Sequence, residues 1–215
     1  MQYVISDIHR HYDMFMKMLE KIKFSSNDHL YILGDVIDRG PNPIKTLQWV
    51  FKQKNVELLL GNHEIMLLMA LNKNDIAFQC WMQNGGEITL DQFNKLRQDL
   101  KDDIVKNLIE SKYLIELDKY ILVHAGINPN NTIDKQDKDD LIWIREDFIN
   151  SPTKLNKKVV FGHTPTQYID YSNWGKIWHD QQYKDKIGID CGVYSKKGNL
   201  GCLCLDNLDE FYIEK

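Results

Sequence analysis

The run Leu30-Tyr31-Ile32-Leu33-Gly34-Asp35-Val36-Ile37-Asp38-Arg39-Gly40 decides the fold class of this 215-residue chain. Its first four residues are apolar and predict a short strand that ends at a glycine. Two carboxylates and an arginine then follow the glycine directly. Because ligands gather at the carboxyl ends of strands in α/β sheets, this run predicts both a strand and the edge of a functional site.

The same arrangement occurs on both sides of this run. Residues 3–5 form an apolar segment before Asp7, and residues 56–60 form another before Asn62. Helix-period apolar residues follow each of the three strands, at 15–22, 44–51 and 65–71, and we expect the last helix to be buried. Three strand-helix units in a row predict a sheet with parallel pairing and right-handed crossovers.

The chain changes character after residue 71. Residues 72–111 are polar with a helical period and no strand signal, so we expect a helical insertion at about 72–111. Strand segments then return, and we expect the late ones to pair as hairpins; they lie at 113–117, 120–123, 158–161, 187–190, 200–205 and 211–213. This mixture predicts one α/β (α+β) domain over residues 1–215, with two packed sheets and helices outside.

Charge and composition exclude several functions. The chain has 27 Lys+Arg against 31 Asp+Glu and a net charge of -4, which excludes a nucleic-acid binder with a broad basic face. No segment approaches the ~20 apolar residues of a membrane span, and the N-terminus has no targeting pattern. We therefore expect a cytoplasmic protein with no nucleic-acid or membrane partner. Four cysteines without framework spacing indicate reduced core thiols: Cys80, Cys191, Cys202 and Cys204.

The side chains that follow five predicted strands share a metal-binding chemistry. Asp35 lies 28 residues after Asp7, and Asn62 lies 27 residues after Asp35, so all three should emerge at one sheet edge. The candidate ligands are Asp7, His9, Asp35, Asn62, His124 and His163. Carboxylate, amide and imidazole groups together suit manganese, iron or zinc. Six such groups are too many for one catalytic ion and predict two ions that share a carboxylate, as in two-metal hydrolysis of phosphate esters.

These motifs resemble those of the phosphoprotein phosphatase (PPP) branch of the calcineurin-like metallophosphoesterases. That family's motifs read GDxHG, GDxVDRG, GNHE, HGG or HAG, and GH. The matching segments occur here in the same order, at 6–10, 34–40, 61–64, 124–126 and 162–163. The resemblance points to the bacterial and phage-type Ser/Thr protein phosphatases. It implies a four-layer architecture with two mixed sheets flanked by helices.

The resemblance also implies a role for each matching residue. Asp7 and His9 would bind the first metal, Asp35 would bridge both, and Asn62, His124 and His163 would bind the second. His63 would be the general acid, oriented by Asp38. Arg39 and Arg145 would hold phosphate oxygens, for which the guanidinium fork suits better than lysine. The implied cofactors are two divalent ions, foremost Mn²⁺ with iron or zinc as alternatives, and a hydroxide that bridges them attacks phosphorus directly.

Some positions depart from the family pattern or stay open. Ser6 and Arg10 occupy positions where the family usually has glycine, and Ile37 occupies the position of the motif's valine. Arg10 either brings a third cation to the site or points to solvent. The aromatic segment 168–183 either packs as a loop, which we favour, or walls the substrate groove.

The expected function is a metal-dependent phosphomonoesterase, foremost a Ser/Thr protein phosphatase acting on phosphoproteins or small phosphoesters. The first alternative is a symmetrical dinucleoside tetraphosphatase, which shares the metal motifs. Members of that group tend to lack the Asp of the DRG segment, carry GNHD and run longer, whereas Asp38 and Glu64 are present here in a short chain. The second alternative is an inactive metal-binding regulatory protein, but no ligand, acid or arginine of the motifs is missing.

Overall fold

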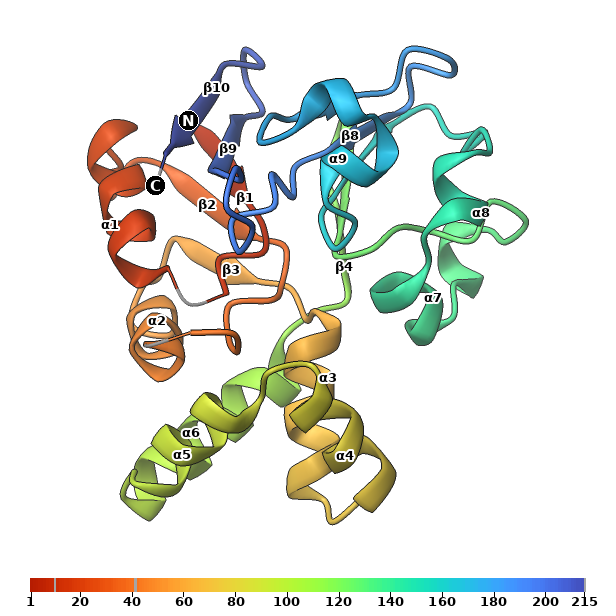
Figure 1. Cartoon of the computed structure of the whole chain (residues 1–215). Coiled ribbons are helices and arrows are strands. Elements are labelled where there is room, and N and C mark those ends of the chain that lie inside the picture. The colour runs from red at the N-terminus through yellow and green to blue at the C-terminus, as the bar shows by residue number, and fades with distance from the viewer. Residues whose placement is uncertain (10, 41, 215) are drawn as a thin grey trace.

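A computed structural model describes residues 1–9, 11–40 and 42–214 and shows two stacked five-stranded mixed sheets (Figure 1). The strand order is β10-β9-β1-β2-β3 in the first sheet and β4-β5-β6-β8-β7 in the second. Apolar residues from both sheets form a common buried cluster, which includes Val4 and Leu203 from the first sheet and Val160 from the second. The predicted architecture of two packed mixed sheets with helices outside is confirmed.

The first sheet combines a parallel core with a C-terminal hairpin. Its strands are β1 (Gln2–Ile5), β2 (His29–Ile32), β3 (Val56–Leu58), β9 (Leu200–Cys204) and β10 (Glu210–Ile213). Because side chains alternate along a strand, Val4 faces the second sheet while Ile5 faces the helices α1 (Tyr12–Lys21) and α2 (Pro43–Val50). Cys202 and Cys204 share this helix-covered face, as their spacing predicts, and all four cysteines are free.

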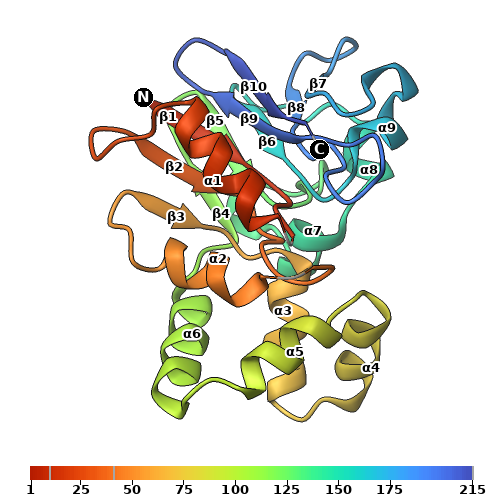
Figure 2. The ribbon, with the colours of Figure 1, turned by 60° about the vertical axis from the view of Figure 1, so that its left-hand side comes forward.

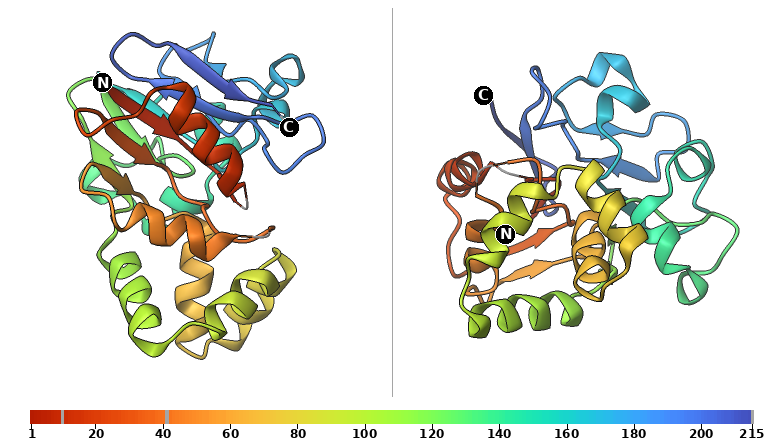
Figure 3. Two further views of the ribbon diagram at one scale, coloured as in Figure 1. Left: turned by 90° about the vertical axis from the view of Figure 1, so that its left-hand side faces the viewer. Right: turned by 60° about the horizontal axis from the view of Figure 1, so that its bottom comes forward.

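The second sheet carries shorter helices on its outer face. Its strands are β4 (Leu114–Glu116), β5 (Tyr120–Val123), β6 (Lys158–Phe161), β7 (Trp178–His179) and β8 (Lys186–Gly188). Val123 and Phe161 pack there against Leu141 of α7 (Lys138–Trp143) and Phe148 of α8 (Glu146–Ile149). The remaining short helices are η1 (Ile133–Lys135), α9 (Thr166–Ile169) and η2 (Tyr171–Asn173). Figure 3 shows the two sheets from further directions, with helices outside them.

The expectation that all the late strands pair as hairpins is wrong for segments 187–190 and 200–205. β8 pairs in parallel with β6, whereas β9 pairs antiparallel with β1 and β10, so the two segments lie in different sheets. The turn-rich link between them carries the chain from one sheet to the other. A turn signal specifies a local change of direction, but the buried faces decide which strand each segment joins. The expected hairpin of segments 113–117 and 120–123 is confirmed, since β4 pairs antiparallel with β5, and β9 forms a second hairpin with β10.

Helices fill the stretch between β3 and β4 and lie beyond one end of the sheets (Figure 2). They are α3 (Asn62–Leu71), α4 (Asp75–Gln83), α5 (Glu87–Asn94) and α6 (Gln98–Glu110). The prediction that α3 is buried along its length is wrong at its C-terminal end, where Met69 and Leu71 are exposed. Ile109 is also exposed, because it lies off the face through which Ile104 and Leu108 of α6 pack. No helix in the described ranges is long and apolar enough to cross a membrane.

Candidate metal centre and active site

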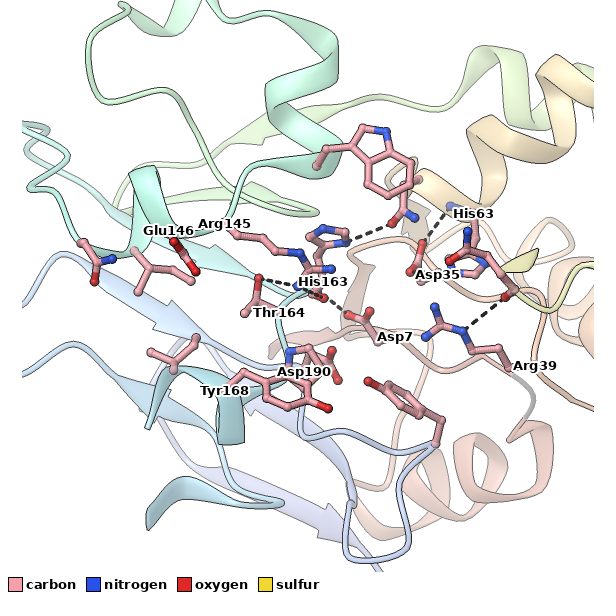
Figure 4. A pocket seen from close by; sticks show the side chains of 18 residues that line it. Asp7, Asp35, Arg39, His63, Arg145, Glu146, His163, Thr164, Tyr168 and Asp190 are labelled. Carbon is pink, nitrogen blue, oxygen red and sulfur yellow. Dashed lines mark hydrogen bonds and ion pairs between the residues drawn. The ribbon is translucent and has the colours of Figure 1, made fainter. Parts of the chain in front are cut away.

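A cavity of about 510 Å³ opens where the strand ends of the two sheets meet (Figure 4). It is lined by side chains that follow β1, β2 and β6 and by the start of α3, namely Asp7, Asp35, Asn62, His63 and His163. Arg39, Arg145 and Asp190 also reach it. Residues far apart in the sequence therefore converge on one cavity, at the sheet edge where the strand spacing predicts them.

The loops that carry these side chains have an unusual backbone. Six site residues adopt the left-handed region, with φ between 47° and 66°: Asp7, His9, Asp35, Asp38, Arg39 and His163. Non-glycine residues rarely adopt this region, and such strain concentrates at functional sites. Gly34, with φ of 80°, allows the loops after β2 and β3 to approach closely, since an added Cβ would lie 2.5 Å from the Gly61 nitrogen.

One buried group of candidate ligands contains Asp35, His124 and His163, with Asn62 beside it. Nδ1 of His124 donates to the Leu33 carbonyl at 2.6 Å, which leaves the Nε2 lone pair directed inward. That Nε2 lies 3.0 Å from Oδ1 of Asn62 and 3.5 Å from Oδ1 of Asp35. Nδ1 of His163 lies 3.0 Å from the same Asn62 oxygen. Electron-donating atoms thus face one another, which suits a cation between them.

A second buried group contains His9, Asp35 and His63, so Asp35 belongs to both. Nδ1 of His9 donates to the Ile37 carbonyl at 3.1 Å, and its Nε2 lies 3.9 Å from Oδ2 of Asp35. Asp7 lines the same cavity but lies outside this group. Its Oδ2 accepts hydrogen bonds from the Ser6 hydroxyl and, at 2.9 Å, from the His163 backbone nitrogen.

The electrostatics of the two groups fit divalent cations. Burial lowers the pKa of His9, His63 and His163 well below the usual range, so the imidazoles stay neutral and keep lone pairs for a metal. Burial, together with the charges of Asp7 and Glu64, raises the pKa of Asp35. Among the described residues, the Nε2 atoms of both His63 and His163 are buried without a hydrogen-bond partner. Two buried His/Asp groups that share Asp35 are therefore consistent with a dinuclear metal centre.

His63 is held by Asp38 at the base of the cavity. Its Nδ1 donates to Oδ2 of Asp38 at 2.6 Å, and both side chains are fully buried. Nε2 lies 3.8 Å from Oδ2 of Asp35. Burial raises the pKa of Asp38 to about 7, against the effect of hydrogen bonds from Thr89 and Trp81. This arrangement fixes the proton of His63 on Nδ1 while the ring is neutral, with Nε2 toward the metal groups.

The two arginines approach the cavity from opposite sides (Figure 4). Nε of Arg39 donates to the Asn84 carbonyl at 3.5 Å, and its Nη1 lies 3.1 Å from Nε2 of His9. The Arg39 guanidinium also lies 5.0 Å from the ring centre of Tyr194. Nη1 of Arg145 donates to the His163 carbonyl at 3.1 Å and to the Thr164 hydroxyl at 3.0 Å. Both guanidinium groups line the cavity and suit bidentate binding of phosphate oxygens.

Sequence reasoning missed the structural role of Glu64. Its Oε2 accepts from the backbone nitrogens of Asp35 at 2.8 Å and Gly61 at 3.0 Å, and its Oε1 accepts from Val36 at 2.9 Å. A glutamate three residues after the residue that begins a helix is a capping pattern, so the sequence could have predicted the hydrogen bond from Gly61 to Glu64. The hydrogen bonds from Asp35 and Val36 could not be predicted in this way.

The positions that the sequence left open have different outcomes. Tyr168 of the aromatic segment 168–183 lines the cavity, whereas Trp174 and Trp178 do not. Asp190 and Tyr194, which are not among the predicted site residues, also line it. Arg10 lies outside the described residues.

Comparisons with known proteins agree with a phosphoesterase site of this geometry. A family model described as calcineurin-like phosphoesterase matches residues 3–191. The symmetrical bis(5'-nucleosyl)-tetraphosphatase of Chromobacterium violaceum is 29% identical over 87% of this chain and 60% of its own length. That of Buchnera aphidicola subsp. Baizongia pistaciae is 33% identical over 94% and 64%. Serine/threonine-protein phosphatase 2 of Salmonella typhimurium is 29% identical over 92% and 89%. The chain spans about half the length of the first tetraphosphatases that it matches, between 44% and 60%.

Solved structures share the fold. The crystal structure of a putative diadenosine tetraphosphatase superposes with a TM-score of 0.74 at 21% identity, covering 99% of this chain and 92% of that one. A serine/threonine phosphatase from Saccharomyces cerevisiae gives 0.64 at 15% identity, covering 100% and 79%. Fold and site together define a metal-dependent phosphoesterase. More particularly, the chain belongs to the calcineurin-like phosphoesterase family.

Proposed function

We propose that this protein hydrolyses dinucleoside tetraphosphates symmetrically into two nucleoside diphosphates. The observation that carries the proposal is the series of tetraphosphatase relatives at 29–36% identity. These relatives support the first alternative from the sequence better than they support the protein-phosphatase expectation.

The shape of the cavity supports a nucleotide substrate. Beyond the metal groups, the cavity continues to an apolar and aromatic wall made by Trp143, Ile149, Tyr168 and Ile169. Tyr168 is largely exposed, so its ring is available for a base to stack on. Arg145 lies on the side of this wall and Arg39 on the opposite side of the metal groups, so both suit the negative charges of a polyphosphate chain (Figure 4).

Each residue of the site has a part in the proposed reaction. When bound, two divalent ions, of which we propose Mn²⁺, supply Lewis-acid stabilisation of the phosphoryl charge and lower the pKa of the attacking water. Arg39 and Arg145 bind phosphate oxygens and orient the phosphorus toward the metal groups. When its Nε2 also carries a proton, His63 gives that proton to the oxygen of the departing nucleoside diphosphate, while its Nδ1 proton stays on the hydrogen bond to Asp38 that orients the ring.

A Ser/Thr protein phosphatase is the second candidate. The Salmonella typhimurium phosphatase favours it, because it aligns over 92% of this chain and 89% of its own length. The retained Asp38 and Glu64 favour it as well, since both occur in the motifs of the PPP branch.

The test compares substrates under one metal. The protein is loaded with Mn²⁺, and kcat/KM is measured for diadenosine tetraphosphate and for phosphoserine, phosphothreonine and phosphotyrosine peptides. We expect the tetraphosphate to be preferred and to yield ADP alone. Higher kcat/KM on a phosphopeptide would favour the second candidate, and formation of AMP and ATP would contradict symmetrical cleavage.

A further inference from the structure

The carboxylate of Asp38 is held by the helices α4 and α5 as well as by His63. Nε1 of Trp81 donates to Oδ2 of Asp38 at 2.7 Å, beside the 2.6 Å hydrogen bond from Nδ1 of His63. The hydroxyl of Thr89 donates to the other oxygen, Oδ1, at 2.5 Å. It also accepts from the Asp38 backbone nitrogen at 3.0 Å. Both oxygens of this carboxylate are therefore fixed by donors 43 and 51 residues away along the chain.

The segment from Trp81 to Thr89 is shaped to make these contacts. Both side chains are fully buried. The turn between α4 and α5 passes over the loop after β2, where the Gly85 carbonyl accepts from the Arg39 backbone nitrogen at 3.1 Å. A Cβ on Gly86 would lie 2.5 Å from Nε1 of Trp81, so only glycine leaves room for the indole there. The turn thus brings the two donors to opposite oxygens of one carboxylate.

The orientation of His63 depends on Asp38. Nε2 of His63 is buried with no hydrogen-bond partner in the part of the chain that the structure describes, and the ring is fixed through Nδ1. An Asp38 carboxylate that lost either outer donor would be free to turn about its last torsion, which is soft for aspartate. The hydrogen bond to Nδ1 would then lose its alignment, and with it the direction in which Nε2 points.

We propose that Trp81 and Thr89 are positioning residues for the reaction, fixing the Asp38 carboxylate and through it the His63 ring. This inference rests on the proposed function only in taking His63 as the acid that protonates the leaving oxygen. It does not depend on which phosphate substrate is natural, because the test uses two aryl phosphates whose leaving oxygens differ in their need for that proton.

The test uses Trp81→Phe, which keeps an aromatic ring without the N–H, and Thr89→Val, which keeps the shape without the hydroxyl. Rates are measured under Mn²⁺ on phenyl phosphate and on 4-nitrophenyl phosphate, whose leaving group needs less protonation. For each variant we expect kcat on phenyl phosphate to fall by about 10-fold or more. The loss on 4-nitrophenyl phosphate should be smaller, with KM and Mn²⁺ affinity unchanged. Thr89→Ser, which keeps the hydroxyl, should retain the wild-type kcat on both substrates.

A second set of variants separates positioning from general structural support. In a His63→Asn background, Trp81→Phe and Thr89→Val should cause no further loss, because the acid through which they act is gone. Trp178→Phe is the matched control, since Trp178 is a buried tryptophan that does not line the cavity, and it should leave both rates unchanged. Thermal denaturation checks that each variant is folded. An equal loss on both substrates, or a further loss in the His63→Asn background, would overturn the inference. If the tetraphosphate proposal fails while the leaving-group effect is seen, only the substrate assignment is wrong.

Discussion

The side-chain oxygen of Asn62 lies 3.0 Å from Nδ1 of His163, with both residues buried. The same oxygen lies 3.0 Å from Nε2 of His124, whose Nδ1 proton is already given to the Leu33 carbonyl. An amide oxygen and a ring nitrogen without a proton cannot hydrogen-bond to each other. A cation between these atoms would satisfy them, which is consistent with a metal site in this cluster.

Asp35 belongs to both candidate metal groups, so we expect its substitution to have the largest effect on metal binding. Asp35→Asn removes a negative charge that both groups share. We expect Mn²⁺ affinity to fall by more than the ~100-fold loss seen for outer-shell partners, and turnover to be nearly abolished. Calorimetric Mn²⁺ titration and initial rates measure the two effects. Asp91→Asn, which changes an exposed carboxylate, is the control, and near-normal turnover in Asp35→Asn would exclude the bridging role.

Glu64 accepts from two backbone nitrogens of the loop after β2, those of Asp35 and Val36, and from a third, that of Gly61 after β3. In Glu64→Gln, the amide NH₂ must face at least one of these N–H groups, which leaves a buried donor without an acceptor. We expect the free energy of unfolding to fall by about 2 kcal/mol. Urea unfolding measures it, with the exposed Glu116→Gln as control. Equal stabilities of the two variants would show that the loop does not depend on the carboxylate.

The raised pKa of Asp38 predicts a pH dependence of stability in the metal-free protein. Burial raises this pKa to about 7 from the usual 3.8. Because the folded value lies above the unfolded one, the folded protein holds more protons in this window and stability falls as pH rises through it. The variant Asp38→Asn has no carboxyl at this position, so its stability does not change with pH through this group. Its free energy of unfolding relative to the wild type should therefore rise by about 3 kcal/mol between about pH 5 and pH 8.

Urea unfolding in EDTA at these two pH values checks this prediction. A difference between variant and wild type that stays constant with pH would contradict the assignment of the raised pKa to Asp38.

Much of this site could be predicted from the sequence, because each candidate ligand follows a strand and the strand spacing places it at one sheet edge. The contacts of Trp81 and Thr89 could not, since neither residue differs in pattern from an ordinary core position. Their partner lies 43 and 51 residues away, and only the packing of α4 and α5 brings it near. The pairing of β8 and β9 was mispredicted for a related reason, because their link resembles a hairpin turn although the buried faces belong to different sheets.

Tyr168 tests the nucleotide proposal. Tyr168→Ala removes an exposed ring from the cavity wall, and stacking of one base contributes about 1–3 kcal/mol. We expect KM for diadenosine tetraphosphate to rise by about 10-fold, while 4-nitrophenyl phosphate kinetics stay unchanged because that substrate has no base. Tyr171→Ala is the matched control, since Tyr171 is equally exposed nearby but does not line the cavity. The same change in both variants would contradict a base-binding role for Tyr168.

Metal removal and titration test the dinuclear centre most directly. The protein is stripped with a chelator and dialysed, and phosphate release from 4-nitrophenyl phosphate is followed while Mn²⁺ is added back against a known protein concentration. Two ligand groups that share Asp35 predict negligible activity without metal and a rate that saturates near two bound Mn²⁺ per chain. Full activity in the presence of the chelator would contradict metal-dependent hydrolysis, and saturation at one ion per chain would contradict the dinuclear centre.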